Sequence, residues 1–265
     1  PKETAFILND AGARALIYHE TFDGAVAVVR GLVKTLEFCV RIGTTPQPGA
    51  DLPWADMSAS PAVAPMPEIN PATALAVIVY PSGTTGHPKG AMLTHGNLLA
   101  NTDSIGQALQ VVPGAERFLV VLPFFHAFAA TACMLMPLFS GSMIVALPRF
   151  DPAQTVEMIA TTRSTIFMGV PSMFIALLHL SDAHMASLAS LKYCISGGAA
   201  LPVAVKEQFE KRTGKIIYEG DGPTECSPCT CVNPIGGRTK PGTIGLPLPG
   251  VEMCILSEHG EPVAD

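Results

Sequence analysis

The chain has few charged side chains. Asp, Glu, Lys and Arg make up 14% of its 265 residues, against roughly 25% in an average soluble protein. A deficit of this size predicts that part of the surface is normally covered by other polypeptide. The longest basic run is Lys211-Arg212 and the formal net charge is −6, so a nucleic-acid partner has little support.

No signal peptide is recognisable, and the seven cysteines are an odd number. Both features favour a reducing compartment and predict a cytoplasmic protein. Residues 118–148 contain no Asp, Glu, Lys or Arg, so a membrane span has to be considered. Pro123, Pro137 and Gly141 cut this stretch into pieces too short to cross, which favours a buried strand, helix and strand. Peripheral association with membranes stays open.

Helices and strands alternate along most of the chain. Residues 4–18 and 24–43 each read as a helix followed by a strand. Further on, strands alternate with helices at 73–80, 95–110, 118–122, 128–139, 142–147, 152–161, 164–168, 171–180, 191–195, 202–213 and 215–218. This order predicts an α/β fold, a layered domain with a largely parallel sheet and flanking helices.

The pattern divides the chain into four segments. Residues 1–45 form a partial α/β segment, and 46–71, with seven prolines, form an irregular connector. Residues 72–240 form the α/β core with a glycine-rich loop, and 241–265 begin a β-rich segment that breaks off. Both ends of the fold are therefore expected to lie outside this sequence.

The glycine-rich loop at 80–90 is the most informative segment. It follows the apolar run Ala72–Tyr80, so it is expected to leave the end of a buried strand. Its glycines free backbone N–H groups, and its hydroxyls and lysine add donors, an array suited to phosphate oxygens. These residues are Ser82, Gly83, Thr84, Thr85, Gly86, Lys89 and Gly90. The spacing is not that of a Walker loop. The alternative is a solvated turn.

This loop resembles the phosphate loop of the adenylate-forming superfamily, which includes acyl-CoA synthetases, peptide-synthetase adenylation domains and beetle luciferases. Further motifs match in the family's order. They are Leu93-Thr-His-x-Asn-Leu98, Leu122-Pro-Phe-Phe-His126, Ser196-Gly-Gly-Ala199, Gly222-Pro-Thr-Glu225 and Gly242-Thr-Ile-Gly-Leu-Pro-Leu-Pro-Gly250. The resemblance implies part of the large N-terminal domain of such an enzyme, without its mobile C-terminal domain.

The resemblance implies a two-step ligase reaction. A carboxylate attacks the α-phosphate of ATP to give an acyl-adenylate and pyrophosphate, and coenzyme A then displaces AMP. Ser82, Gly83, Thr84, Thr85 and Gly86 would cradle phosphate, with Thr84 among the catalytic residues. Lys89 would bind phosphate or brace the loop through an acidic neighbour.

Glu225 is implied as a catalytic residue and the Mg²⁺ ligand, with Thr224 donating to phosphate. The alternative for Glu225 is a surface residue that caps the following turn. His126 is implied as a catalytic residue that shapes the carboxylate pocket; the alternative is a satisfied core histidine.

Backbone around Gly197, Gly198 and Ala199 is implied to line the adenine and acyl sites. Val170 and Pro171 are expected to wall the acyl pocket, with ordinary core packing as the alternative. Gly220, Asp221 and Gly222 belong to the nucleotide motif. The family usually carries an aromatic that stacks on adenine where Asp221 stands, so we expect weakened ATP binding.

Cys226, Cys229 and Cys231 could suggest a metal site, but structural zinc needs four well-spaced ligands, which favours plain thiols. His95 is expected to begin a helix.

We therefore expect an ATP-dependent carboxylate–CoA ligase, acting on medium- or long-chain fatty acids, with ATP, Mg²⁺ and coenzyme A. The lean toward fatty acids rests on Gly197, Gly220 and Gly222, which would leave a tunnel open, and on the resemblance of residues 219–227 to fatty-acid ligases. This chain alone, without the rest of its polypeptide, is expected to be inactive. The alternatives are a non-catalytic nucleotide- or acyl-binding module, and an adenylation domain for an aryl or amino acid.

Overall fold

The computed structural model describes residues 1–45, 51–59, 65, 67–81 and 88–263. The chain divides into two compact units, Pro1–Asn70 with Tyr80–Ala91, and Pro71–Val79 with Met92–Asp265. The candidate site lies in the second unit.

The first unit is a small α/β layer. Its strands are β1 (Ala15–His19), β2 (Phe38–Ile42) and β3 (Leu52–Pro53), all parallel in the order β1-β2-β3. Its helices are α1 (Lys2–Asp10), the 3₁₀ turn η1 (Glu20–Phe22), α2 (Asp23–Leu32) and α3 (Trp54–Ser58). Two small clusters hold it together, one around Val29 and one around Val26 and Cys39. The predicted helix-then-strand order is confirmed.

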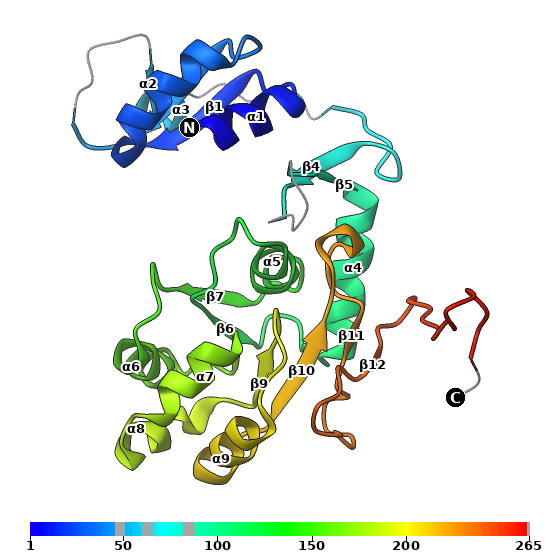
Figure 1. The fold of residues 1–265 in the computed structure, drawn as a ribbon. Coiled ribbons are helices and arrows are strands. Elements are labelled where there is room, and N and C mark those ends of the chain that lie inside the picture. Colours follow the sequence, from blue (N-terminus) through cyan, green and yellow to red (C-terminus); the bar gives the residue numbers. More distant parts are fainter. Residues whose placement is uncertain (46–50, 60–64, 66, 82–87, 264–265) are drawn as a thin grey trace. The chain divides into compact units, whose positions relative to one another are not determined.

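The second unit is built on a seven-stranded sheet in the order β12-β11-β10-β9-β8-β6-β7 (Figure 1). Its strands are β6 (Arg117–Val120), β7 (Met143–Ala146), β8 (Ile166–Gly169), β9 (Tyr193–Ser196), β10 (Ile217–Asp221), β11 (Cys231–Val232) and β12 (Leu246–Pro247). Strands β7, β6, β8, β9 and β10 are parallel, and β11 and β12 join antiparallel. The predicted α/β fold with a largely parallel sheet is confirmed.

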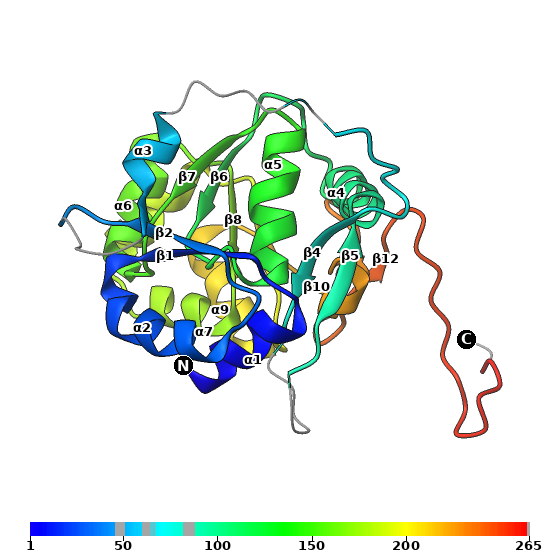
Figure 2. The ribbon, with the colours of Figure 1, turned by 90° about the horizontal axis from the view of Figure 1, so that it is seen from above.

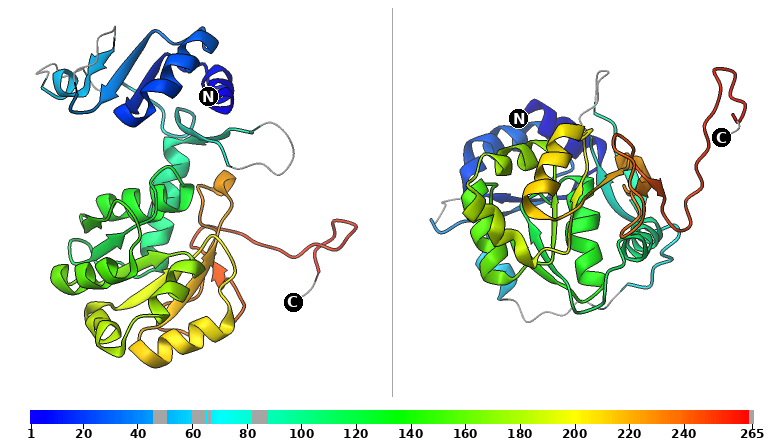
Figure 3. Two further views of the ribbon diagram at one scale, coloured as in Figure 1. Left: turned by 60° about the vertical axis from the view of Figure 1, so that its left-hand side comes forward. Right: turned by 90° about the horizontal axis from the view of Figure 1, so that it is seen from below.

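Both faces of this sheet are covered by helices. They are α4 (His95–Ala108), the π-helix η2 (Ala129–Leu135), α5 (Met136–Phe139), α6 (Pro152–Thr162), α7 (Pro171–Leu178), α8 (Asp182–Ala186), η3 (Ser187–Ser190), α9 (Val203–Thr213) and η4 (Thr224–Cys226). Figure 2 shows α4 and α5 on one side of strands β6 and β8, and α6 and α7 on the other. In Figure 3 the yellow α9 lies across the sheet from the green α5.

The alternation of side chains along the strands explains this layering. Phe118 and Val120 of β6 enter the cluster beneath α4 and α5, whereas Leu119 and Val121 enter the cluster beneath α6, α7 and α9. A parallel strand buried on both faces needs apolar residues at successive positions. This is why residues 118–122 contain no polar side chain.

The strand before the glycine-rich loop differs from the prediction. β4 (Leu75–Val79) pairs with β5 (Ala91–Thr94) in a separate two-stranded sheet instead of joining the main sheet. Leu75 is 43% exposed and Val77 is 36% exposed, so the expectation of a buried strand is wrong. An apolar run alone does not tell a core strand from a strand at a separate edge.

Helix α4 begins at His95, as predicted, because Thr94 and Asn97 form a capping box. Thr94 N–H donates to Asn97 Oδ1 at 2.9 Å, and Asn97 N–H donates to Thr94 Oγ1 at 3.1 Å. The capping residue is therefore Thr94, and His95, the first residue of the helix, is exposed.

Smaller differences concern element type. The helix expected at 128–139 is mostly the π-helix η2, and α8 was not predicted. The β-rich tail consists of β12 and a single bridge between Leu256 and Pro262.

The predicted segment boundaries at 45/46, 71/72 and 240/241 stay predictions. Among the described residues, no helix has the length and apolarity that crossing a bilayer would require.

Candidate active site

A cavity of about 270 Å³ lies where three parallel strands of the second unit lead out of the sheet. His126 and Phe128 follow β6, Gly197 and Gly198 follow β9, and β10 ends at Asp221. Ligands of open α/β sheets bind beyond the carboxyl ends of their strands. The fold therefore places this cavity where a substrate site is expected.

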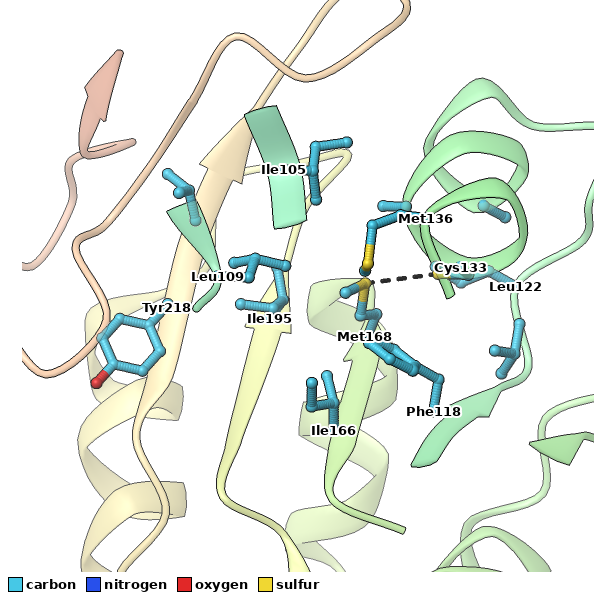
Figure 4. Packing of buried hydrophobic residues seen from close by; sticks show 14 of the residues in the cluster. Ile105, Leu109, Phe118, Leu122, Cys133, Met136, Ile166, Met168, Ile195 and Tyr218 are labelled. Atoms are coloured by element: carbon cyan, nitrogen blue, oxygen red, sulfur yellow. Dashed lines mark hydrogen bonds between the residues drawn. The ribbon is translucent and has the colours of Figure 1, made fainter. Parts of the chain in front are cut away.

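Most of the cavity wall is apolar. Helix α4 contributes Ile105, and its C-cap residue Leu109, four residues further on, lies on the same side. The remaining apolar lining includes Ala132, Met168, Ile195, Val232 and Leu248. Figure 4 shows Ile105, Ile195 and Met168 pointing toward one another from α4, β9 and β8. Such a surface suits a hydrocarbon group.

Polar groups occur at the strand ends. His126, Asp221 and Thr224 line the cavity, and His126 and Asp221 are exposed. The His126 amide donates to the Pro123 carbonyl at 3.0 Å, and the His126 carbonyl accepts from Ala130 N–H at 2.8 Å. These bonds fix the backbone of the loop. The exposure of His126 rules out the core-histidine alternative.

Two glycines of the cavity wall pack closely against neighbouring residues. A Cβ atom on Gly197 would lie 3.2 Å from the ring of Phe128, and one on Gly220 would lie 3.0 Å from the carbonyl oxygen of Cys231. Gly198 has φ of +79°, in the left-handed region that favours glycine. Close packing at Gly197 and Gly220 and the backbone conformation at Gly198 therefore favour glycine at the ends of β9 and β10.

The loop that joins β10 to β11, residues 222–230, carries three of the predicted site residues, Gly222, Thr224 and Glu225. Thr224 begins the turn η4 and lines the cavity. Glu225 is the next residue and is exposed; no described residue forms an ion pair with it. Thr230 N–H donates to the Asp221 carbonyl at 3.0 Å and closes the loop.

Three further predicted residues of the second unit are not among the described lining residues of this cavity. Ala199 is exposed beside Gly198 but does not line the cavity, and neither Val170 nor Pro171 is among its described lining residues. Lys89 is exposed and belongs to the first unit. Ser82, Gly83, Thr84, Thr85 and Gly86 lie outside the described residues. Their assignments as site residues stay predictions.

One residue with a clear place in the site was missed. Asn101 of α4 is 7% exposed, and its side chain hydrogen-bonds both backbone groups of Cys229. The two residues are 128 positions apart, so no local sequence signal could have paired them. The helical repeat Asn101, Ile105 and Leu109 would have placed Asn101 on the buried face of α4.

The thiols near the cavity are not arranged as a metal site. In the described part of the chain, no group of three or more His, Cys, Asp or Glu side chains is placed to hold an ion. Burial raises the pKa of the Cys229 thiol to about 12, which disfavours the thiolate that binds metals. Cys229 is partly buried, Cys231 is buried, and Cys226 is exposed.

An α/β domain with an apolar cavity, bordered by glycines and polar groups at the strand ends, is typical of proteins that bind a small organic ligand. The family model described as "AMP-binding enzyme" matches residues 1–265. The chain belongs to this family of AMP-binding enzymes.

Relatives with named activities match most of the chain. A long-chain-fatty-acid–CoA ligase of Bacillus subtilis (strain 168) is 45% identical over 195 residues, which cover 73% of this chain and 35% of the relative. A long-chain-fatty-acid–CoA ligase of Escherichia coli O157:H7 is 36% identical over 202 residues. A mitochondrial malonate–CoA ligase of Mus musculus is 35% identical over 198 residues.

Solved structures share the fold. An anthranilate–CoA ligase in complex with anthranoyl-AMP matches with a TM-score of 0.90 and 28% identity, over 100% of this chain and 51% of that one. ATP-bound MatB from Rhodopseudomonas palustris matches with a TM-score of 0.84 and 27% identity, over 99% of this chain and 50% of that one. The chain thus spans about a third of the curated relatives' length and about half of these structures.

Proposed function

We propose that the protein containing this chain is an ATP-dependent carboxylate–CoA ligase that acts on medium- or long-chain fatty acids. One observation carries the proposal: a single cavity joins an apolar interior to a polar border at the strand ends. A fatty acid has the same division, with a hydrocarbon chain and one reactive carboxylate. The fatty-acid ligases among the relatives support this substrate class.

In this proposal the hydrocarbon chain lies between α4 and the sheet. Ile105, Leu109 and Met168 would bind it by removing apolar surface from water, which contributes about 0.8 kcal/mol for each buried methylene. The carboxylate then lies near His126 and Thr224. Holding this anion in line with the α-phosphate is the main task of the site, since two anions must approach each other.

The adenylation step forms a bond between the acid's oxygen and the α-phosphorus, and pyrophosphate leaves. In this proposal the Thr224 hydroxyl would donate to a phosphate oxygen, and the backbone at Gly197 and Gly198, which also lines the cavity, would face the nucleotide. The predicted phosphate loop, Ser82–Gly86, would hold the β- and γ-phosphates. Coenzyme A would then attack the acyl carbon through its thiol and release AMP.

Glu225 fits a magnesium ligand. Its carboxylate is exposed, unpaired with any described cation and next to Thr224, and Mg²⁺ usually binds one or two carboxylates while keeping waters and substrate phosphates. The ion would neutralise phosphate charge. Glu225 would hold it close to the Thr224 hydroxyl.

We also propose that the protein is cytoplasmic, as the sequence predicts.

Two other substrate classes, and a non-catalytic binding role, are less well supported. A malonate or an aryl acid, as named for two of the similar proteins, would leave the apolar lining at Ile105 and Leu109 partly unused. A non-catalytic binding module is favoured by a single observation, the exposed carboxylate of Asp221 at the cavity. A charged group at that place would repel a polyphosphate.

The test is acid-dependent exchange of pyrophosphate into ATP by the full-length protein. Fatty acids of two to eighteen carbons, benzoate and malonate are each tested as the acid at equal concentration. The proposal expects the highest kcat/KM for a medium or long chain. Exchange that is best with malonate or benzoate would contradict the substrate class, and absence of exchange with every acid would favour the binding module.

A further inference from the structure

We propose that Asn101 is a positioning residue, which fixes the 222–230 loop and thereby the place of Thr224 and Glu225 during adenylation. The inference rests on the proposed function and adds a residue that no motif of the sequence indicates. It follows from one pair of hydrogen bonds between helix α4 and that loop.

The contact is reciprocal. Asn101 Nδ2 donates to the Cys229 carbonyl at 2.7 Å, and Asn101 Oδ1 accepts from the Cys229 N–H at 3.2 Å. A backbone carbonyl can only accept and a backbone N–H can only donate, so the orientation of the amide is determined. Asn101 is 7% exposed. Removing its amide would leave two backbone groups in a largely buried place without partners.

Cys229 passes this restraint to the first half of the loop. The backbone of Pro228 and Cys229 packs directly on Gly222, where any Cβ atom would overlap it. Next along the chain, Thr230 donates to the Asp221 carbonyl through its N–H at 3.0 Å and through Oγ1 at 3.1 Å. Residues 221–222 therefore rest on residues 228–230, and Asn101 holds the latter.

The rest of the loop has only local support. Cys226 N–H donates to the Pro223 carbonyl at 2.9 Å, and Ser227 N–H donates to the Thr224 carbonyl at 3.2 Å. Among the described residues outside 221–232, only Asn101 has a side chain that hydrogen-bonds to the backbone of residues 222–229. Thr224 and Glu225 lie between these two anchored ends.

The same helix face lines the apolar cavity. Asn101, Ile105 and Leu109 follow one another at intervals of four residues, so they share one side of α4. Ile105 and Leu109 line the cavity while Asn101 holds the loop. Helix α4 thus sets the distance between the acyl chain and the residues that face the phosphates.

The experiment uses the full-length protein with two substitutions. Asn101→Leu keeps the size and removes both hydrogen bonds. Asn101→Asp keeps the acceptor but turns an oxygen toward the Cys229 carbonyl. Ser104→Ala is the matched control, because Ser104 also bonds from α4 to a distant carbonyl, that of Pro249, but does not touch the 222–230 loop.

Two readouts are measured beside thermal unfolding. The first is kcat and KM in acid-dependent pyrophosphate exchange. The second is the rate at which iodoacetamide labels Cys229, relative to the exposed Cys254 outside the loop, followed by mass spectrometry. We expect both Asn101 variants to lose about tenfold or more in kcat, with KM for the acid changed by less than about threefold. Labelling of Cys229 should rise about tenfold as the loop opens. Ser104→Ala should change neither.

The outcomes separate the inference from the proposed function. Wild-type kcat and wild-type labelling in either folded variant would overturn the role of Asn101. A change confined to thermal unfolding would do the same, since it would make Asn101 merely structural. If Asn101→Leu fails to fold, Asn101→Asp decides. If the wild-type protein shows no exchange but the variants still label faster, the ligase proposal and the catalytic role fall together, while the loop restraint stands.

Discussion

Gly222 and Pro228, six positions apart in the sequence, lie backbone against backbone. A Cβ atom on Gly222 would overlap the carbonyl group of Pro228 and come within 2.7 Å of the Cys229 Cα atom. The close approach shapes the loop that carries Thr224 and Glu225. Only glycine fits at this position without a shift of that loop.

Gly222→Ala should therefore displace the loop. We expect a loss of about 1–3 kcal/mol in the free energy of unfolding, typical of overpacking, and a fall of about a hundredfold in kcat because catalytic groups are misplaced. Denaturant unfolding and pyrophosphate exchange measure the two effects. Gly106→Ala is the control: a Cβ atom there meets nothing within 4 Å, so it should leave activity unchanged and stabilise α4 slightly. Equal behaviour of the two variants would refute the steric argument.

Asp221→Tyr should strengthen ATP binding. An aromatic ring that stacks on a base contributes about 1–3 kcal/mol, which corresponds to a tenfold to hundredfold change in Kd. Calorimetric titration of the full-length protein measures it. Asp221→Asn separates charge from stacking, because it removes the carboxylate without adding a ring. Equal ATP affinities for the wild type and Asp221→Tyr would contradict the expectation.

Leu109 should limit the length of the acid. It is 3% exposed and lines the apolar end of the cavity. Leu109→Phe should shift the preference toward shorter acids, with about a fourfold loss in kcat/KM for each methylene that no longer fits. The same substitution at Leu99, exposed on α4, should leave the chain-length profile unchanged. An unaltered profile for Leu109→Phe would place the acyl chain elsewhere.

Cys229 should be unreactive at neutral pH. Burial raises the pKa of its thiol to about 12, so only about one molecule in ten thousand carries the thiolate at pH 8. Iodoacetamide should therefore label the exposed Cys226 and Cys254 long before Cys229. Peptide mass spectrometry after timed labelling checks this, and equal rates at Cys226 and Cys229 would be incompatible with a buried thiol.

The same burial gives stability a pH dependence. Burial also raises the pKa of the Cys133 and Cys194 thiols. The unfolded chain loses these protons near pH 9, whereas the folded chain keeps them to higher pH. The free energy of unfolding should therefore fall as the pH rises from about 9 toward 12. A free energy of unfolding that stays constant over this pH range would contradict the raised pKa of these thiols.

The sequence predicts much of the fold because its strands are buried on both faces. Runs such as Phe118–Leu122 and Ile166–Met168 are apolar at every position, and the intervening helices carry the helical period. The 75–79 strand has an equally apolar sequence but pairs only with β5. Strand pairing depends on partners far along the chain, which a local pattern does not encode.

The candidate site, like the fold, is predicted by the sequence only in part. His126, Gly198, Asp221 and Thr224 stand in short motifs at strand ends, and the parallel sheet brings them to one cavity. Asn101 belongs to no motif, because its role depends on a loop 128 residues away. The apolar lining from Ile105 and Leu109 looks like ordinary helix core until the cavity beside it is seen.

The most direct measurement is a crystal structure of the full-length protein with a non-hydrolysable fatty acyl-adenylate analogue. We predict that the hydrocarbon chain lies between α4 and the sheet, in contact with Ile105, Leu109 and Met168, and that the phosphate lies beside Thr224. A hydrocarbon chain bound outside this cavity, or a phosphate remote from the 222–230 loop, would contradict it.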